Sequence, residues 1–145
     1  MLKIALYGVV VLVLAGVGGF FALGMMSQGQ SAPGLVEGRL APCPSSPNCV
    51  SSEEGTEAEK TVDPLPASAW EKLPQIVTSM GGKVTTQEDS YIAAEFKSAT
   101  FGFVDDLEFR KADNDVQVRS ASRVGYSDAG VNAKRVAALR AALKE

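Results

Sequence analysis

The stretch FVDDLEFRKADNDVQVRSASR, residues 103–123, decides the fold. Apolar and polar residues alternate through residues 103–111 and again through residues 116–123, and a period of two is typical of half-buried strands. Between the two runs lies Asp113-Asn114, a pair of residues that suits a tight turn. The stretch therefore predicts an antiparallel hairpin.

The position of the turn predicts the register of this hairpin. If Ala112 faces Asp115, each further pair lies one residue farther from the turn on both strands. A slip by one residue would exchange the two faces of the sheet, because side chains alternate with a period of two. The expected cross-strand partners are Glu108 with Arg119, Leu107 with Ser120, and Asp105 with Ser122.

The same alternation assigns the side chains of the hairpin to two faces. One face is mainly apolar and is expected to face the core; it carries Phe103, Leu107, Phe109, Val116 and Val118. The other face carries Asp106, Glu108, Arg119 and Arg123. We expect this second face to be solvated, with charge pairs between the strands, because antiparallel sheets commonly expose one side to water.

Asp105 shares the core face with Ser120 and Ser122, where an unpaired carboxylate would be strongly destabilising. A helix is expected over residues 129–144, and at 100° per residue Asn132 and Arg135 fall inside its apolar arc. We therefore expect Asp105 to be mostly buried and hydrogen-bonded to these neighbours. Such a cluster is either a buried structural network or a ligand site, and structural networks are the more common of the two.

Between this last strand and the helix, residues 125–128 are expected to form the turn. Ser127 or Asp128 would then cap the helix, and Tyr126 would pack over the turn or line a pocket beside it. Free N–H groups at the helix N-terminus, together with Arg119 or Arg123, would attract a small anionic ligand. The candidate ligand-binding residues are Asp105, Arg119, Ser120, Ser122, Arg123, Tyr126, Asn132 and Arg135.

The chain before the hairpin predicts a second hairpin and a helix. KVTTQE (residues 83–88) and YIAAEFKS (residues 91–98) alternate like strands. Upstream, Ser68 and Glu71 form a capping box, Pro74 is expected to kink the helix, and Gly81-Gly82 ends it. The apolar stripe of this helix is Trp70, Leu73, Val77 and Met80. The sequence thus predicts an α+β domain over residues 63–145, a four-stranded antiparallel sheet with two helices packed on one face.

The N-terminal segment, residues 4–26, contains no charged residue. At about 1.5 Å per residue it reaches roughly 35 Å as a helix, enough to cross a hydrocarbon core of about 30 Å. It exceeds the usual apolar region of a cleaved signal peptide, the rival interpretation, so we expect residues 1–26 to be a transmembrane anchor. Lys3 precedes the span, which predicts a single-pass protein of the inner membrane with its C-terminal domain in the periplasm or exterior.

Residues 27–62 are expected to be a linker that contains a disulfide loop and an acidic loop. Outside the cytoplasm, Cys43 and Cys49 should be oxidised to a disulfide. Metal binding or redox chemistry is the alternative for this pair, although two thiolates alone fill half of a tetrahedral shell. Residues 53–63 carry five carboxylates against Lys60, which indicates a solvated loop.

Composition narrows the function classes. There is no histidine, the commonest general base and metal ligand, so we expect no His-based catalytic or metal site and no cofactor. With 14 Lys and Arg against 17 Asp and Glu, the chain offers no strongly basic face for nucleic acid. The expected partners are the membrane and, beyond it, a lipid, a small anionic ligand or a membrane protein.

Three blocks, CPSSPNCVSS from Cys43, FGFVDDLEF from Phe101 and RSASRVGYSDAGVNAKR from Arg119, resemble the family called domain of unknown function 1499 (DUF1499). The resemblance implies a small, often membrane-anchored bacterial domain, and it carries over no activity and no catalytic residue. We therefore expect a membrane-anchored periplasmic domain that is a non-catalytic binding or assembly module. The alternatives are a hydrolase-like enzyme that uses a carboxylate without histidine, and a structural subunit of a membrane complex.

Overall fold

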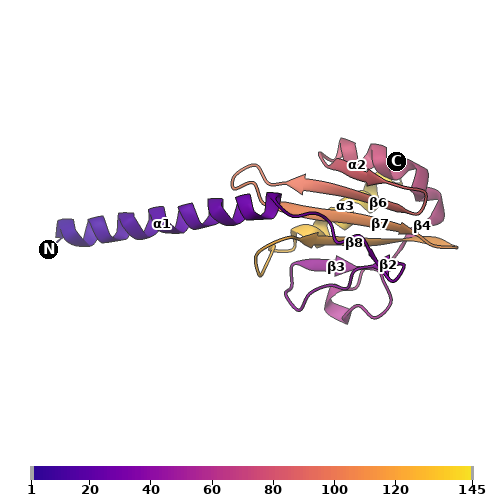
Figure 1. The fold of residues 1–145 in the computed structure, drawn as a ribbon, viewed down its shortest axis with the longest axis horizontal. Helices are drawn as coiled ribbons and strands as arrows, with labels where there is room; N and C mark the ends of the chain where they lie inside the picture. The colour runs from indigo at the N-terminus through magenta and orange to yellow at the C-terminus, as the bar shows by residue number, and fades with distance from the viewer. Residues whose placement is uncertain (1, 145) are drawn as a thin grey trace.

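The computed structural model describes residues 2–144 and has an α+β fold preceded by a long apolar helix (Figure 1). Helix α1, Leu2–Gln28, extends away from the folded domain as a single rod. Within the described residues it is the one helix long and apolar enough to cross a membrane, over Leu6–Gln28. Length and composition alone fit a membrane span or a signal sequence near the N-terminus.

The main sheet has six strands, two more than the sequence predicted, in the order β3-β8-β7-β6-β5, with β4 also paired to β8. Its strands are β3 Cys49–Ser51, β4 Leu65–Pro66, β5 Lys83–Gln87, β6 Tyr91–Lys97, β7 Val104–Lys111 and β8 Asp115–Ser122. A separate two-stranded sheet pairs β1 Leu35–Val36 with β2 Arg39–Leu40. The missed strands are only two or three residues long, so they show no alternation in the sequence.

The predicted register of the β7–β8 hairpin is confirmed. Glu108 pairs with Arg119, Leu107 with Ser120, and Asp105 with Ser122. The pairing of β6 with β7 is also continuous from Tyr91 to Lys97, and the one irregularity in these pairings lies between β5 and β6. Because β7 has no bulge in either pairing, the alternation of side chains is preserved along its whole length.

The helices differ from the prediction at the start of the first one. A 3-10 helix, η2 Ala67–Lys72, leads into α2, Leu73–Ser79, and neither has a side-chain cap, so the Ser68–Glu71 capping box does not form. Pro74 lies in the first turn of α2, where a missing N–H is tolerated, so it does not kink the helix interior. The last helix, α3, spans Val131–Ala142, and a further 3-10 turn, η1, spans Ala58–Lys60.

The core lies between one face of the sheet and the helices η2, α2 and α3. Its largest fully buried side chains include Phe109, Leu107, Val116 and Val118, as the alternation predicted. Phe103 is the exception: it is partly exposed and packs against Phe20 of α1. It lies just before β7, at the end of the sheet where α1 meets the domain (Figure 1).

The second face of the sheet is also covered, and the expectation that it is solvated is wrong. Asp106, Glu108 and Arg119 are 3%, 0% and 7% exposed. The chain between α1 and β3 crosses this face, with Leu40 packed on Tyr91 and Ala93. The covering segment is irregular apart from β1 and β2, so periodicity could not reveal it.

Candidate functional site

The polar residues between the sheet and α3 form one network, here called the helix-facing cluster: Asp105, Ser120 and Ser122 from the sheet and Asn132 and Arg135 from α3. Arg135 Nη2 lies 2.7 Å from Asp105 Oδ2, and the two side chains are 10% and 14% exposed. The Ser120 hydroxyl donates to Asn132 Oδ1 at 2.6 Å, and Arg135 Nη1 donates to the same serine oxygen at 3.1 Å. The prediction that Asp105 is mostly buried beside these partners is confirmed.

Asn132 joins the helix-facing cluster to two other parts of the chain. Its side-chain nitrogen lies within 3.1 Å of the Asn48 carbonyl and of Ser122 Oγ, and 2.8 Å from Asp128 Oδ2. Asp128 also accepts the backbone N–H groups of Gly130 and Asn132, so it occupies the N-terminus of α3. Burial alone would raise the pKa of Asp128, but these hydrogen bonds outweigh it and hold the pKa below its ordinary value.

The geometry of the helix-facing cluster bears on its chemistry. Ser120 is fully buried, and its proton is already donated to Asn132. The Asp105 carboxylate is paired with Arg135, whose guanidinium also stacks 4.6 Å from the centre of the Phe96 ring. A nucleophilic serine needs a nearby base and access to substrate, and neither is present for Ser120 in this arrangement. The contacts favour a structural network.

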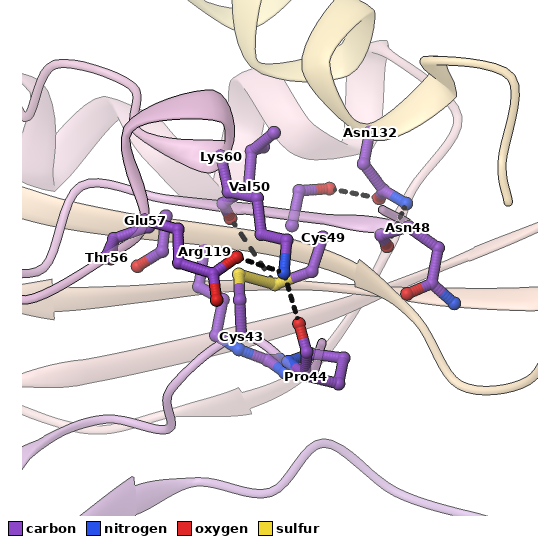
Figure 2. Close-up of a disulfide and its surroundings, with 12 residues drawn as sticks. Cys43, Pro44, Asn48, Cys49, Val50, Thr56, Glu57, Lys60, Arg119 and Asn132 are labelled. Atoms are coloured by element: carbon purple, nitrogen blue, oxygen red, sulfur yellow. Dashed lines mark hydrogen bonds and ion pairs between the residues drawn. A yellow bond between two sulfur atoms is a disulfide. The ribbon is translucent and has the colours of Figure 1, made fainter. Parts of the chain in front are cut away.

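Cys43 and Cys49 form the predicted disulfide, with their Cα atoms 5.6 Å apart (Figure 2). Lys60 is 6% exposed; its Nζ donates to the Pro44 carbonyl at 2.6 Å and pairs with Glu57 at 2.8 Å. Asn48 donates to the Gly125 carbonyl at 2.8 Å, which fixes the loop against the turn before α3. Since the two sulfurs are bonded to each other, neither is free to bind a metal.

The acidic segment is largely the solvated loop that its composition indicated, because the Glu54, Glu57, Glu59 and Asp63 side chains are exposed. Glu53 is the exception. Glu53 is 7% exposed and accepts two hydrogen bonds from Arg110 and one from the Leu40 N–H. Burial alone would raise the pKa of Glu53, yet the bonds from Arg110 and Leu40 lower it below its ordinary value. Among the described residues, no group of three or more His, Cys, Asp or Glu side chains is placed to hold a metal ion.

The opposite face of the sheet holds a second polar group, here called the ion-pair face: Asp106, Glu108, Arg119 and Arg123. Glu108 is fully buried and accepts hydrogen bonds from Arg119 Nη1, the Tyr91 hydroxyl and the Gly34 N–H. Burial raises the pKa of Glu108 despite these donors, and burial together with Glu108 raises the pKa of Tyr91. The expected charge pairs between the strands therefore exist, in a buried setting.

Arg123 connects the ion-pair face to the end of α1. Its guanidinium forms ion pairs with Asp106 at 2.7 Å and Glu95 at 2.6 Å, and its side chain is 3% exposed. Hydrogen bonding to Asp106 raises the pKa of Arg123 above its ordinary value, although burial opposes this. The same side chain donates to the backbone carbonyls of Ser27 and Gln30, which lie at and just beyond the C-terminal end of α1.

The last turn of α1 is packed into the domain. Ser27 is fully buried; its hydroxyl accepts the Val104 N–H at 3.0 Å and donates to the Gly24 carbonyl at 2.6 Å. A Cβ placed on Gly24 would lie 1.8 Å from the Phe101 carbonyl oxygen, so only glycine fits there. Ser27 and Gly24 could not be predicted as contact residues, because both are ordinary residues in an apolar helix and its polar end.

Aromatic rings extend this contact along α1. Phe20 lies 5.3 Å from Phe101 and 6.3 Å from Phe103, and Phe21 lies 5.1 Å from Phe101, measured between ring centres. Phe101 and Phe103 belong to the connection between β6 and β7. In Figure 1 this connection and the β8–α3 connection both lie at the end of the domain where α1 enters.

A pocket of about 440 Å³, here called the junction pocket, lies between α1 and these two connections. Apolar side chains dominate its lining, and Asp105, Ser122 and Asp128 border it with Tyr126. Tyr126 is 76% exposed. The apolar residues that line the junction pocket are Phe20, Leu23, Phe103, Val124 and Val131.

The structure divides the predicted site residues between two faces of the sheet. The contacts described above unite Asp105, Ser120, Ser122, Asn132 and Arg135 beside α3. Arg119 and Arg123 lie on the ion-pair face, where both are paired with carboxylates. They do not join the N-terminus of α3, and Asp128 occupies that terminus. The arrangement expected for a small anion is therefore not assembled from these residues.

Comparison with known proteins gives a family and no function. A family model described as "protein of unknown function (DUF1499)" matches residues 39–143. No curated protein and no solved structure matches the chain. The matched range covers the disulfide loop, all six strands of the main sheet and α3, and it begins after α1.

Proposed function

The chain belongs to the DUF1499 family, and from its geometry we propose that it is a membrane-anchored binding module that acts at the outer surface of the inner membrane. In this proposal α1 is an uncleaved span, and the α+β domain faces the periplasm. The module is non-catalytic and presents a site at the base of the domain, close to the bilayer.

The observation that carries the proposal is the packing of the last turn of α1 into the domain. Ser27 is fully buried and hydrogen-bonded to Val104, and Arg123 binds the carbonyls of Ser27 and Gln30. Signal peptides are removed from the mature protein, so selection for folding would not require their end to fit the domain. A helix that ends as part of the sheet's hydrogen-bonding network is better explained as a permanent element.

Charge and redox state support the orientation. Lys3 precedes the apolar run, and a positive charge on that side favours a cytoplasmic N-terminus. The Cys43–Cys49 disulfide suits an oxidising compartment such as the periplasm. Both observations favour a domain that lies outside the cytoplasm.

Binding is favoured over catalysis by the state of the polar side chains. Ser120 is enclosed, and Asp105 is paired with Arg135, so the hydrolase-like alternative lacks an accessible nucleophile and base in this cluster. The junction pocket, in contrast, is an open, mainly apolar space with a few polar groups at its border. That combination is typical of ligand sites.

Reporter fusions test the proposed anchoring and orientation. Alkaline phosphatase joined after residue 144 should be active and membrane-bound, and green fluorescent protein at the same position should be dark. Deleting residues 2–26 should abolish the phosphatase activity, which serves as the matched control. A bright fluorescent fusion with an inactive phosphatase fusion would contradict the orientation, and an active phosphatase released into the soluble periplasm would contradict the anchor.

A further inference from the structure

We propose that the junction pocket holds an acyl chain of a bilayer lipid. This inference rests on the proposed function, because it requires α1 to stay in the membrane. It adds a binding site and a ligand class that neither the family description nor the fold provides.

The walls of the junction pocket come from three separate parts of the chain. Phe20 and Leu23 of α1 form one wall and are 53% and 40% exposed. Phe103 contributes from the β6–β7 connection, and Val124 and Val131 contribute from the segment between β8 and α3. Val131 is 44% exposed, so its side chain still presents apolar surface to the outside. A volume of about 440 Å³ lies in the range of roughly 300–1,000 Å³ found for small-molecule pockets.

The position of these walls along α1 selects a lipid as the occupant. A hydrocarbon core of about 30 Å is crossed by roughly twenty helical residues. Counted from Ile4, just after Lys3, twenty residues end at Leu23. Phe20 and Leu23 therefore lie within one turn of the point where the span leaves the hydrocarbon. A pocket that begins there is continuous with the acyl chains that surround α1.

The polar groups at the border indicate which part of the lipid enters. Asp105 is paired with Arg135, and Asp128 accepts the N–H groups at the start of α3. No lysine or arginine is among the described residues that line the pocket, so a phosphate has no cation there. Hydroxyls of Ser98, Ser122 and Ser127 remain beside the apolar walls. These groups suit an acyl chain whose ester carbonyl stays near the mouth.

Aromatic residues beside the pocket fit the same position. Phe101 packs against Phe20 and Phe21, and Tyr126, which is 76% exposed, lies at the border of the pocket. Tyrosine is enriched at membrane–water interfaces because its ring is apolar and its hydroxyl is polar. The base of the domain therefore has the chemistry of an interface on the side where the pocket opens.

Photolabelling from within the bilayer tests the proposal. The full chain is reconstituted into phosphatidylethanolamine–phosphatidylglycerol nanodiscs that contain a phosphatidylethanolamine with a diazirine in its acyl chain. After irradiation and trypsin digestion, adducts are expected on three peptides: residues 4–39, which include most of α1, residues 98–110, which include Phe103, and residues 124–134, which include Val124 and Val131.

A variant that fills the pocket separates occupancy from surface contact. Val131→Trp should reduce labelling of residues 98–110 at least fivefold and leave labelling of residues 4–39 unchanged. Val36→Trp is the matched control, because Val36 is 49% exposed on β1 and does not line the pocket. It should leave all three peptides labelled as in the wild type.

The possible failures are distinguishable. Labelled residues 4–39 with unlabelled residues 98–110 and 124–134 would overturn the pocket proposal and leave the anchor intact. If Val131→Trp does not reduce the labelling of residues 98–110, the lipid contacts only the surface of the domain, and the pocket proposal is also overturned. Covalent dimers joined through these peptides, in place of lipid adducts, would identify a second copy as the occupant. Absence of labelling on residues 4–39 would reject the proposed function itself.

Discussion

Arg123 shows how much of this architecture depends on single buried charges. Its guanidinium contacts Asp106 of β7, Glu95 of β6 and the backbone at the end of α1. Replacing one partner of a buried ion pair by a neutral residue lowers the stability of the fold, because the other partner is left as an unpaired charge away from water. Arg123 therefore stabilises both the sheet and the position of α1, and the charges of the ion-pair face have structural roles.

Asp105 offers a direct test of the helix-facing cluster. We expect Asp105→Ala to lower the free energy of unfolding by about 3 kcal/mol, because Arg135 would keep its charge without its partner. The measurement is guanidinium-induced unfolding of the full chain in mild detergent. The double variant Asp105→Ala with Arg135→Met should recover most of the loss, since it removes both charges. Unchanged stability in the single variant would contradict a structural role and favour a ligand site.

Glu53 predicts a specific dependence on pH. Hydrogen bonds from Arg110 and Leu40 hold its pKa in the folded protein below the ordinary value of 4.5. At a pH between the lowered pKa of the folded protein and 4.5, Glu53 is protonated in the unfolded chain and ionised in the folded chain. The stability that Glu53 contributes is therefore complete above pH 4.5. It is lost as the pH falls through the lowered pKa. The free energy of unfolding of the wild type should exceed that of Glu53→Gln by about 2 kcal/mol at pH 7, and this difference should shrink below pH 4.5.

The same unfolding curves, recorded at neutral and acidic pH, supply the check on Glu53. Glu54→Gln is the matched control, because the Glu54 side chain is 86% exposed in its pair with Arg39 and should contribute little at any pH. A difference between wild type and Glu53→Gln that stays constant down to pH 2 would show that the charge of Glu53 is not what matters.

At the scale of elements, the decisive contact is between the last turn of α1 and the start of β7. Gly24 lies against the Phe101 carbonyl, and one turn later Ser27 accepts the Val104 N–H. The absence of a side chain at Gly24 brings helix and loop together, and Ser27 then takes the place of a neighbouring strand for that N–H. Helix and sheet thus share a hydrogen bond that neither could satisfy alone.

Gly24→Ala should separate these two elements. The added Cβ would lie 1.8 Å from the Phe101 carbonyl oxygen, so the helix end must move and release the Val104 N–H. We expect hydrogen exchange of the Val104 amide to accelerate at least tenfold. Gly19→Ala is the control, because a Cβ at Gly19 meets nothing within 4 Å and should leave the exchange rate unchanged. Equal protection in both variants would be evidence against the docked helix.

At the scale of the whole molecule, the sequence predicted the part of the fold that regular patterns specify. Alternation and the Asp113-Asn114 turn predicted the β7–β8 register, which placed Asp105 on the core face. Together with the phase of the last helix, that register predicted the contact between Asp105 and Arg135. Short strands such as β3 and β4 escaped prediction because two or three residues show no period.

Burial of the ion-pair face also escaped prediction. Whether Glu108 is solvated depends on residues far away in sequence, such as Gly34, and alternation along β7 carries no information about them. The junction pocket was missed for the same reason. Its apolar walls come from α1 and two loops, and of its lining residues only Asp105, Ser122 and Tyr126 were among the predicted site residues.

The central claim is that α1 stays attached as the membrane anchor of the domain. The most direct measurement is the intact mass of the mature protein, extracted from membranes with detergent and analysed without reduction. The account predicts a mass that includes residues 1–26 and shows the two cysteines joined. A mature protein whose mass begins near Met25 would contradict it, because the span would then be a signal peptide and the domain would have no anchor.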